Sequence, residues 1–273
     1  MNHIAFAVVM LCGHAVFSAD LKPVYGQPKQ EKKAIQIKNE RSPFGQLLRA
    51  IIDKKSNQLN DLLEHDKSLL DQTDERGMSA LHYAAMVGNM AAVKMLHDKI
   101  KRRWFQSCLL DKEDIERRTP VHLAISNGHL DVVKYFIEKA DSQVCGKQVR
   151  LAVRYQQKEI MEYLVDRPAN RLPGHYAVRR AIEEASICDT SSEILYALGD
   201  HLDFSLAGDE EAQAIKAALN KIFKRYRLPI AFEFVRGYQM KLTKTHKLEE
   251  IIGANNATAV GEYMKHPQRY IDK

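Results

Sequence analysis

The sequence predicts an all-α protein, a solenoid of repeated helix pairs with few or no strands. A six-residue motif occurs twice, as Ser79–Ala84 (SALHYA) and Thr119–Ala124 (TPVHLA), and both copies follow the scheme Ser/Thr-Ala/Pro-apolar-His-x-Ala. A sparser pattern of small and apolar residues recurs on either side of them. Self-similarity of this kind is typical of repeat architectures. The 273 residues are 45% apolar and 28% charged, with a net charge of +6, which argues against a disordered chain and against a polytopic membrane protein.

Residues 1–19 form the first element, and they contain no Asp, Glu, Lys or Arg. The apolar run Ile4–Leu11 and the small residues Ser18 and Ala19 predict a signal peptide that is cleaved after one of these two residues. The alternative is a buried N-terminal helix. Residues 20–43 mix Pro and Gly with Lys and Gln, and we expect a flexible linker there.

Each copy of the motif predicts the start of one helix and the turn to a second helix. The hydroxyl groups of Ser79 and Thr119 are suited to cap the first helix. Gly88 and Gly128 follow at the same offset and can adopt the left-handed conformation that ends a helix. The second helix then presents an apolar face to its neighbours. We expect this face to contain Val93 and Leu96 in one copy, and Val133 and Phe136 in the other.

These residues resemble the ankyrin repeat family, whose signature is T-P-L-H-x-A-A-x-x-G-H. The resemblance implies stacked helix pairs with turn-forming fingers, and it implies that His82 and His122 hydrogen-bond to turn backbone rather than bind a metal or act as bases. Two departures from the family pattern are present. The copies lie 40 residues apart where the family's period is about 33, with the extra residues in Lys99–Asp111. Arg117 stands at the position of the turn glycine Gly77, which argues against a regular finger in the second copy.

A reduced pattern extends the array to both sides of the motif. It requires a small or apolar residue followed by apolar residues nine and twelve positions later. Matches occur at Ala50 with Leu59 and Leu62, at Ala152 with Met161 and Leu164, at Ile251 with Val260 and Tyr263, and, with an insertion, at Ala181 with Ile194 and Leu198. We therefore expect about six helix pairs, with an ankyrin array over residues 44–204. Residues 205–273 form a degenerate, basic helical region that either continues the stack or is a separate helical domain. The step from Ala124 to Ala152 is too short for a full finger.

No motif for catalysis or cofactor binding is present in the sequence. There is no HExxH, GxSxG, P-loop or GxGxxG pattern, and the four cysteines match neither a zinc site nor a CxxC motif. We therefore predict no catalytic residue, no cofactor and no metal site, and we expect that the protein is not an enzyme.

The resemblance places partner-binding residues on the finger tips and first helices of the two well-matched copies. They are Glu75, Arg76, Met78, Met86 and Val87 in the first copy, and Ile115, Glu116, Arg118, Ser126 and Asn127 in the second. The alternative for Met86 and Val87 is that another part of the chain covers them. Trp104 is a further candidate, because it lies beside four cations in the insertion and Trp and Arg are enriched at interfaces. The alternative is that Trp104 fills the gap between repeats of unequal length.

A basic segment, residues 216–247, contains nine Lys or Arg and one acidic residue, Glu233. On a helix, its cations Lys221, Lys224 and Arg225 lie away from an apolar face, and we call these three residues the basic patch. The apolar face is formed by Ile215, Leu219, Ile222 and Tyr226. Such a helix could contact an anionic membrane surface, and the alternative is a solvated outer face of the stack. No sequence motif supports nucleic acid as a partner.

The sequence therefore predicts a non-enzymatic module that binds another protein through the concave, finger-side surface of the array, and we expect a monomer. The signal predicts export from the cytoplasm, to the periplasm or out of the cell. Ankyrin repeats behind such a signal resemble bacterial exported proteins, including effectors, which implies the host-cell cytoplasm as an alternative location. The alternative function is an ankyrin-targeted bacterial effector in which residues 205–273 are a small enzymatic or membrane-surface-binding region. The identity of the partner does not follow from the fold.

Overall fold

The fold is described from a computed structural model of the chain. It describes residues 37, 39–102, 110–139, 146–166, 174–202, 209–225, 231–235 and 254–265. Within these ranges the structure is helical, and its β-type pairing is an isolated antiparallel bridge between Thr73 and Ser79. The predicted all-α class is confirmed. Among the described residues, no helix is both long enough and apolar enough to cross a membrane.

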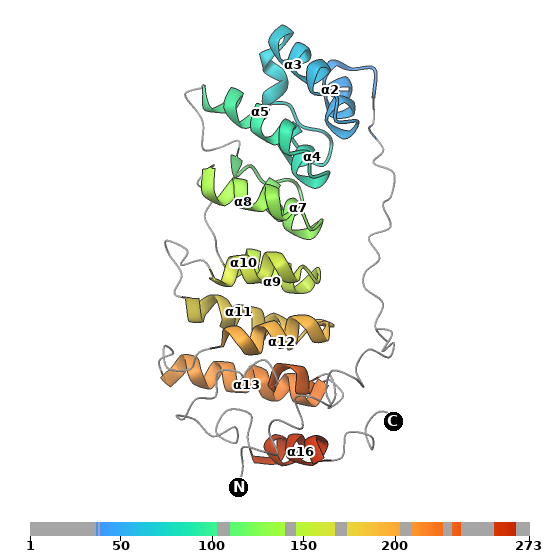
Figure 1. The fold of residues 1–273 in the computed structure, drawn as a ribbon. Coiled ribbons are helices and arrows are strands. Elements are labelled where there is room, and N and C mark those ends of the chain that lie inside the picture. The colour runs from blue at the N-terminus through green and yellow to red at the C-terminus, as the bar shows by residue number, and fades with distance from the viewer. Residues whose placement is uncertain are drawn as a thin grey trace. The chain divides into compact units, whose positions relative to one another are not determined.

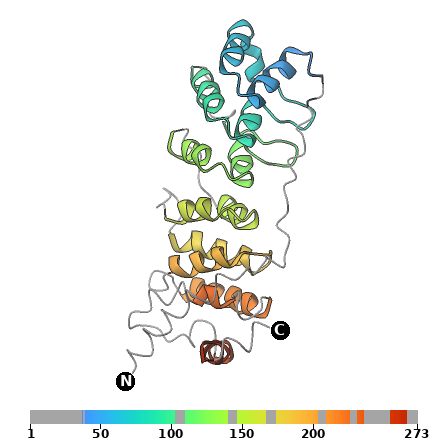
Figure 2. The ribbon, with the colours of Figure 1, turned by 45° about the vertical axis from the view of Figure 1, so that its right-hand side comes forward.

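The helices follow one another as pairs, each consisting of a first helix and a second helix joined by a short turn (Figures 1 and 2). The 3-10 helix η1 (Lys67–Leu70) follows the first pair, and α13 (Asp209–Arg225) and α16 (Ala254–Lys265) follow the last pair. The pairs are α2 (Pro43–Ile52) with α3 (Ser56–His65), α4 (Ala80–Met86) with α5 (Met90–Lys101), α7 (Pro120–Ser126) with α8 (Leu130–Lys139), α9 (Gly146–Arg154) with α10 (Lys158–Asp166), and α11 (Gly174–Ala185) with α12 (Ser192–His201).

The pairs stack so that first helices contact first helices and second helices contact second helices. The first-helix layer runs through α2, α4, α7, α9 and α11, and α13 continues it by packing on α11. The second-helix layer runs through α3, α5, α8, α10 and α12. The described residues belong to one compact unit. Each pair thus contacts the pairs that precede and follow it in sequence, as expected of a repeat solenoid.

Small residues at one register position allow the first helices to approach closely. Ala84, Ala124, Ala152 and Ala181 are all fully buried at the positions that the repeated pattern predicts. The apolar positions of the second helices are also buried, except that Leu62, expected beside Leu59, is half-buried and Leu63 takes its place in the core. These buried residues are Leu59, Val93, Leu96, Val133, Phe136, Met161, Leu164, Ile194 and Leu198.

Side chains at the turns tie the pairs α4/α5 and α7/α8 to the pair before each of them. The Asn89 side chain donates a hydrogen bond to the Ile51 carbonyl at 2.8 Å, and His129 Nε2 donates to the Met86 carbonyl at 3.0 Å. Gly88 has a φ of +65°, and a Cβ atom at this position would lie 2.6 Å from Cε1 of His129. The turn therefore requires glycine both for its left-handed backbone and for the room that the His129 ring occupies.

The start of the array differs from the prediction by a few residues. The linker was expected to extend through residue 43, but Ser42 Oγ accepts a hydrogen bond from the Gly45 N–H at 3.0 Å and caps α2. Pro43 is the first helical residue, where its missing N–H costs nothing. Residues 1–19 and most of 20–43 lie outside the described residues, so the signal peptide and the linker stay predictions.

Candidate functional site

The first finger, residues 73–79, is organised by the carboxylate of Asp74. Its Oδ1 accepts hydrogen bonds from the Arg76 N–H at 2.9 Å and from the Met78 N–H at 2.8 Å. Its Oδ2 accepts from the Tyr83 hydroxyl at 2.8 Å, which fixes the finger to α4. Gly77 completes the turn with a φ of +74°. One side chain thus holds the finger backbone and anchors it to the helix that follows.

The second finger, residues 113–119, has the same design around Asp114. Oδ1 of Asp114 accepts from the Glu116 N–H and the Arg118 N–H, both at 2.9 Å. Its Oδ2 accepts from Arg118 Nε at 2.8 Å instead of from a tyrosine. Burial alone would raise the pKa of Asp114, but the hydrogen bonds and the charge of Arg118 lower it below its ordinary value.

Arg117 does not prevent a regular turn in the second finger, contrary to the sequence prediction. It adopts the left-handed conformation of the turn glycine, with a φ of +58°. The backbone bonds are those of the first finger, since the Asp114 N–H donates to the Arg118 carbonyl and the Arg117 N–H donates to the Asp114 carbonyl, both at 2.9 Å. The hydrogen bonds to Asp114 offset the cost of placing a non-glycine residue in this conformation.

The two fingers are joined to each other through the backbone. The Ile115 N–H donates to the Arg76 carbonyl at 2.9 Å. The side chain of Ile115 remains 69% exposed at the tip of the second finger. The fingers therefore present a large apolar side chain to solvent on a backbone that is fixed on both sides.

The two motif histidines have the structural role that was predicted for them. His82 Nδ1 accepts from the Ser79 N–H, and His122 Nδ1 accepts from the Thr119 N–H, both at 3.1 Å, in a capping box. His82 Nε2 then donates to the Arg118 carbonyl at 3.1 Å, which connects α4 to the second finger. Burial lowers the pKa of both rings, to about 4 in His122, so both are neutral at pH 7.

One predicted contact residue, Met78, is not on the surface. Its side chain is 2% exposed and lies in the hydrophobic core, so the expectation that it faces a partner from the finger tip is wrong. The finger turns back at this residue, whose N–H is bonded to Asp74, and this directs the side chain inward. Met86 and Val87 are half-buried and pack against the core at the end of α4 and the turn after it.

The remaining finger-side candidates are exposed or half-buried. Arg76 and Glu116 are exposed, and Glu116 forms an ion pair with the partly buried Arg118 at 2.9 Å. Ser126 and Asn127 are half-buried at the end of α7, where both side chains donate to the Leu123 carbonyl. Glu75 is exposed. Trp104 lies outside the described residues.

The cations of the basic patch are exposed, but the apolar face of the same helix is occupied. Lys221, Lys224 and Arg225 are solvent-exposed on α13, and Arg225 is paired with Asp189 at 3.0 Å. The residues opposite them are fully buried against the first-helix layer, so this face is already in the core. They are Ile215, Leu219 and Ile222.

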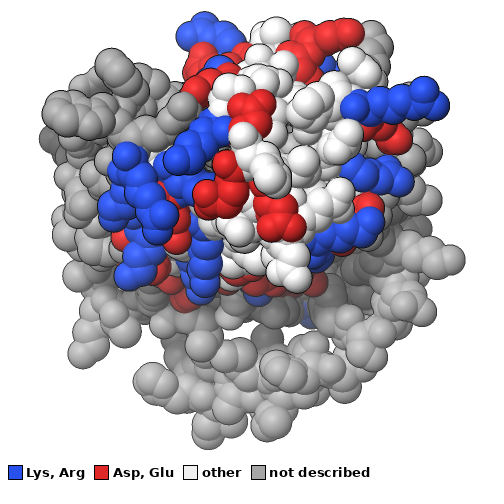
Figure 3. Space-filling view, turned by 90° about the horizontal axis from the view of Figure 1, so that it is seen from above, with Lys and Arg blue, Asp and Glu red and all other residues white. Residues whose placement is uncertain are grey.

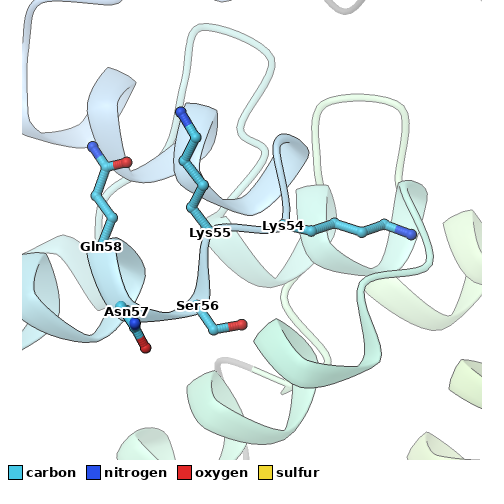
Figure 4. A pocket seen from close by; sticks show the side chains of 5 residues that line it. All are labelled: Lys54, Lys55, Ser56, Asn57 and Gln58. Carbon is cyan, nitrogen blue, oxygen red and sulfur yellow. The ribbon is translucent and has the colours of Figure 1, made fainter.

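Other places in the described residues show no converging chemistry. No group of three or more His, Cys, Asp or Glu among them is arranged to hold a metal ion. Cys188 is half-buried, with its Sγ 3.5 Å from Thr190 Oγ1, and burial raises the pKa of its thiol, so it is not activated as a nucleophile. A shallow hollow of about 520 Å³ lies at the start of α3, where Lys54 and Lys55 point away from one another (Figure 4). On the end of the array seen in Figure 3, acidic and basic side chains are interspersed among neutral ones.

The comparison with protein-family models agrees with this geometry. A profile of ankyrin repeats (three copies) matches residues 47–148 and 103–173. The human protein named ankyrin repeat domain-containing protein 7 is 38% identical over 65 residues, which cover 24% of this chain and 23% of that protein. The crystal structure of the human ASB11 ankyrin repeat domain aligns with a TM-score of 0.48 at 15% identity, over 79% of this chain and 96% of that one.

Residues 47–173 of the chain therefore consist of ankyrin repeats. Ankyrin repeats indicate a protein–protein interaction module, and the fold is generally a non-enzymatic scaffold. The match spans about a quarter of the human relative, so that protein's own activity does not transfer to this chain.

Proposed function

We propose that the protein binds a partner protein through the finger-side surface, which we define as the two fingers together with the ends of α4 and α7. The observation that carries this proposal is Ile115, which is 69% exposed on a finger whose backbone is held by Asp114 and Arg76. An apolar side chain on a fixed turn costs little additional entropy when it is buried by a partner.

The residues around Ile115 suit a protein interface. The charged side chains of Arg76 and Glu116 flank it and give polar contacts at the rim, while the half-buried Met86 and Val87 offer apolar area on the end of α4. A central apolar anchor within a polar rim is the common composition of protein interfaces.

A matched pair of variants tests this proposal. Ile115→Ser removes the exposed apolar side chain of the second finger, and Ile187→Ser removes the 58% exposed isoleucine of the turn between α11 and α12 as a control. Affinity capture of partners from cells, followed by mass spectrometry and by titration of the purified partner, compares both with the unaltered chain. We expect partners that the unaltered chain and Ile187→Ser retain to be lost by Ile115→Ser. Equal recovery by all three proteins would rule out a finger-centred interface.

Export also remains a proposal, supported by the composition of residues 1–19. N-terminal sequencing of the mature protein tests it directly, and an intact Met1 would count against cleavage.

A further inference from the structure

The helix α9 carries three cations on one face and contains no acidic residue. Lys147, Arg150 and Arg154 follow one another at spacings of three and four residues, which places them side by side along the helix. We call these three residues the cationic stripe. The core-facing side of α9 is apolar, since Val149 and Ala152 are fully buried. The stripe therefore lies on the side of the helix that faces away from the core.

The neighbours of the cationic stripe compensate one of its three charges. Arg154 is paired with the buried Glu184 of α11 at 2.7 Å. The Lys147 ammonium donates to the Arg117 carbonyl at 2.8 Å, which holds it beside the second finger, and no carboxylate among the described residues is paired with it. Arg150 is exposed and makes no hydrogen bond or ion pair with any described residue. Two positive charges thus have no counter-charge in the described part of the chain.

The acidic groups of the elements on either side of α9 are paired with other cations. In the second finger, Glu116 lies 2.9 Å from Arg118. In α11, Glu183 accepts hydrogen bonds from Arg179 Nε and from Arg180 Nη1, both at 2.9 Å. The helix α11 thus neutralises its own arginines, whereas α9 contains no carboxylate that could do the same.

The same positions have a structural role in the preceding repeat. In the repeat register, Lys147 corresponds to Thr119 and Arg150 corresponds to His122, and these two residues form the capping box of α7. Neither cation makes such a bond in α9. Like charges at these spacings destabilise a helix slightly, so the stripe does not serve the stability of α9. Residues that break a local rule of stability in this way are typical of binding sites.

The second helix of the same pair has the opposite charge. The helix α10 contains Glu159, Glu162 and Asp166, and its single cation is Lys158. The pair is therefore positive on its first-helix side and negative on its second-helix side. An acidic partner is attracted to α9 and repelled by α10, and this difference determines the side from which it approaches.

We propose that the cationic stripe binds an acidic segment of the partner protein, whose carboxylates contact Arg150 and Lys147. The stripe adjoins the finger-side surface, because Lys147 is bonded to the second finger two residues after Ile115. One partner can therefore bury Ile115 and reach α9. The helix rises about 10 Å from Lys147 to Arg154, and about three residues of an extended chain span this length.

Two or three neighbouring Asp or Glu residues in the partner match the stripe. The planar guanidinium of Arg150 can donate two hydrogen bonds to one carboxylate. Anionic lipid is usually bound by clusters of about four to eight cations, so two uncompensated charges on one helix suit a short acidic segment better. This inference rests on the proposed function and specifies the chemistry of the partner.

Hexaglutamate labelled with fluorescein is the probe for the stripe. It is titrated into the full-length chain and followed by fluorescence anisotropy. We expect saturable binding that weakens by about tenfold or more when NaCl is raised from about 0.05 M to about 0.5 M. Carbodiimide treatment of the complex then joins a glutamate carboxylate to a lysine in direct contact with it. Mass spectrometry should place the main cross-link on Lys147.

Three charge-reversing variants separate the stripe from general electrostatic attraction. Arg150→Glu reverses the exposed guanidinium, so we expect about tenfold weaker binding of hexaglutamate. Lys94→Glu on α5 and Lys221→Glu in the basic patch make the same change of net charge at other exposed residues, and both should keep the affinity within about threefold. Arg150→Glu also replaces a like-charge pair with Arg154 by an opposite-charge pair, so its midpoint in urea denaturation should be unchanged or higher.

Several results would overturn the proposal. They are the absence of saturable binding up to about 1 mM hexaglutamate, an equal loss in Lys94→Glu or Lys221→Glu, and a lower urea midpoint in Arg150→Glu, which would give this cation a role in stability. Arg150-dependent binding of phosphatidylserine vesicles or of hexathymidylate, where hexaglutamate does not bind, would assign a lipid or nucleic-acid partner to the stripe instead.

The failure of this inference is distinguishable from the failure of the proposed function. If hexaglutamate does not bind while Ile115→Ser still loses its partners, the acidic segment is refuted and the finger-side function stands. If hexaglutamate binds through Arg150 while Ile115→Ser keeps all its partners, the finger-centred function is refuted and the stripe remains a binding site.

Discussion

Replacing Gly88 with alanine tests how strictly the turn between first and second helices is determined. Gly88 has a φ of +65°, and the added Cβ atom would lie 2.6 Å from Cε1 and 2.7 Å from Cγ of His129. The left-handed backbone costs an L-residue about 1–2 kcal/mol. The ring of His129 must also move and lose its 3.0 Å bond to the Met86 carbonyl, which adds about 1 kcal/mol. We expect Gly88→Ala to lower the free energy of unfolding by about 2–3 kcal/mol.

Urea denaturation followed by circular dichroism at 222 nm measures this change, with Gly261→Ala as the control. A Cβ atom at Gly261 in α16 meets nothing within 4 Å, so alanine should be neutral or stabilise the helix by up to about 1 kcal/mol. In a His129→Ala background the Gly88→Ala penalty should fall to the backbone cost alone, about 1–2 kcal/mol. A loss below about 0.5 kcal/mol in Gly88→Ala, or strict additivity in the double variant, would show that His129 is not the restraint.

Three further changes test other parts of the structure. Burial, with a contribution from Lys147, lowers the pKa of His122 from 6.5 to about 4, so the folded state resists protonation and the free energy of unfolding should fall as the pH drops from about 6.5 to about 4. In His122→Asn this fall should be smaller, and an unchanged slope of stability against pH would refute the role of His122. Arg154→Ala leaves the buried Glu184 carboxylate without its 2.7 Å partner, so the free energy of unfolding measured with urea should fall by about 1–3 kcal/mol. The double variant with Glu184→Gln should recover most of this free energy, because the side chain at residue 184 is then uncharged. Tyr83→Phe should lower the free energy of unfolding by about 1 kcal/mol. This loss should vanish in an Asp74→Ala background, because Asp74 is the acceptor of the Tyr83 hydroxyl.

The helix pairs were predictable because the determining residues repeat at regular positions. Ala84 and Ala124 mark the close contacts of the first helices, and the register of Ala152 and Ala181 located two degenerate pairs without the full motif. These features could be read from the sequence because a small residue, a helix cap and a left-handed turn each depend on neighbouring residues alone.

The fingers were only partly predictable. Asp74 and Asp114 lie at the same offset from the two motifs, and this repetition in the sequence could have identified them as the residues that organise the turns. The role of Arg117 could not be derived from its own propensity, because the hydrogen bonds to Asp114 decide its conformation. Met78 was misplaced for a related reason, since the direction of its side chain depends on how the finger folds back onto α4.

Contacts between repeats were beyond the sequence pattern. The pairing of Arg225 with Asp189 joins α13 to the preceding turn across many residues, and no periodic signal indicates it. The burial of Ile215 and Leu219 by the stack likewise follows from packing rather than from the amphipathic pattern, which would equally suit a membrane-bound helix.

The turn bonds from Asn89 to Ile51 and from His129 to Met86 have a consequence for synthesis on the ribosome. In each case a carbonyl at the end of one first helix receives its donor only from the next helix pair. Because the chain emerges from its N-terminus, the pairs α2/α3 and α4/α5 stay incomplete until the following pair has left the ribosome. Folding of this part during translation therefore lags by one repeat, and a pause in translation just before residue 89 or residue 129 would leave a nascent array whose last pair lacks its turn bond.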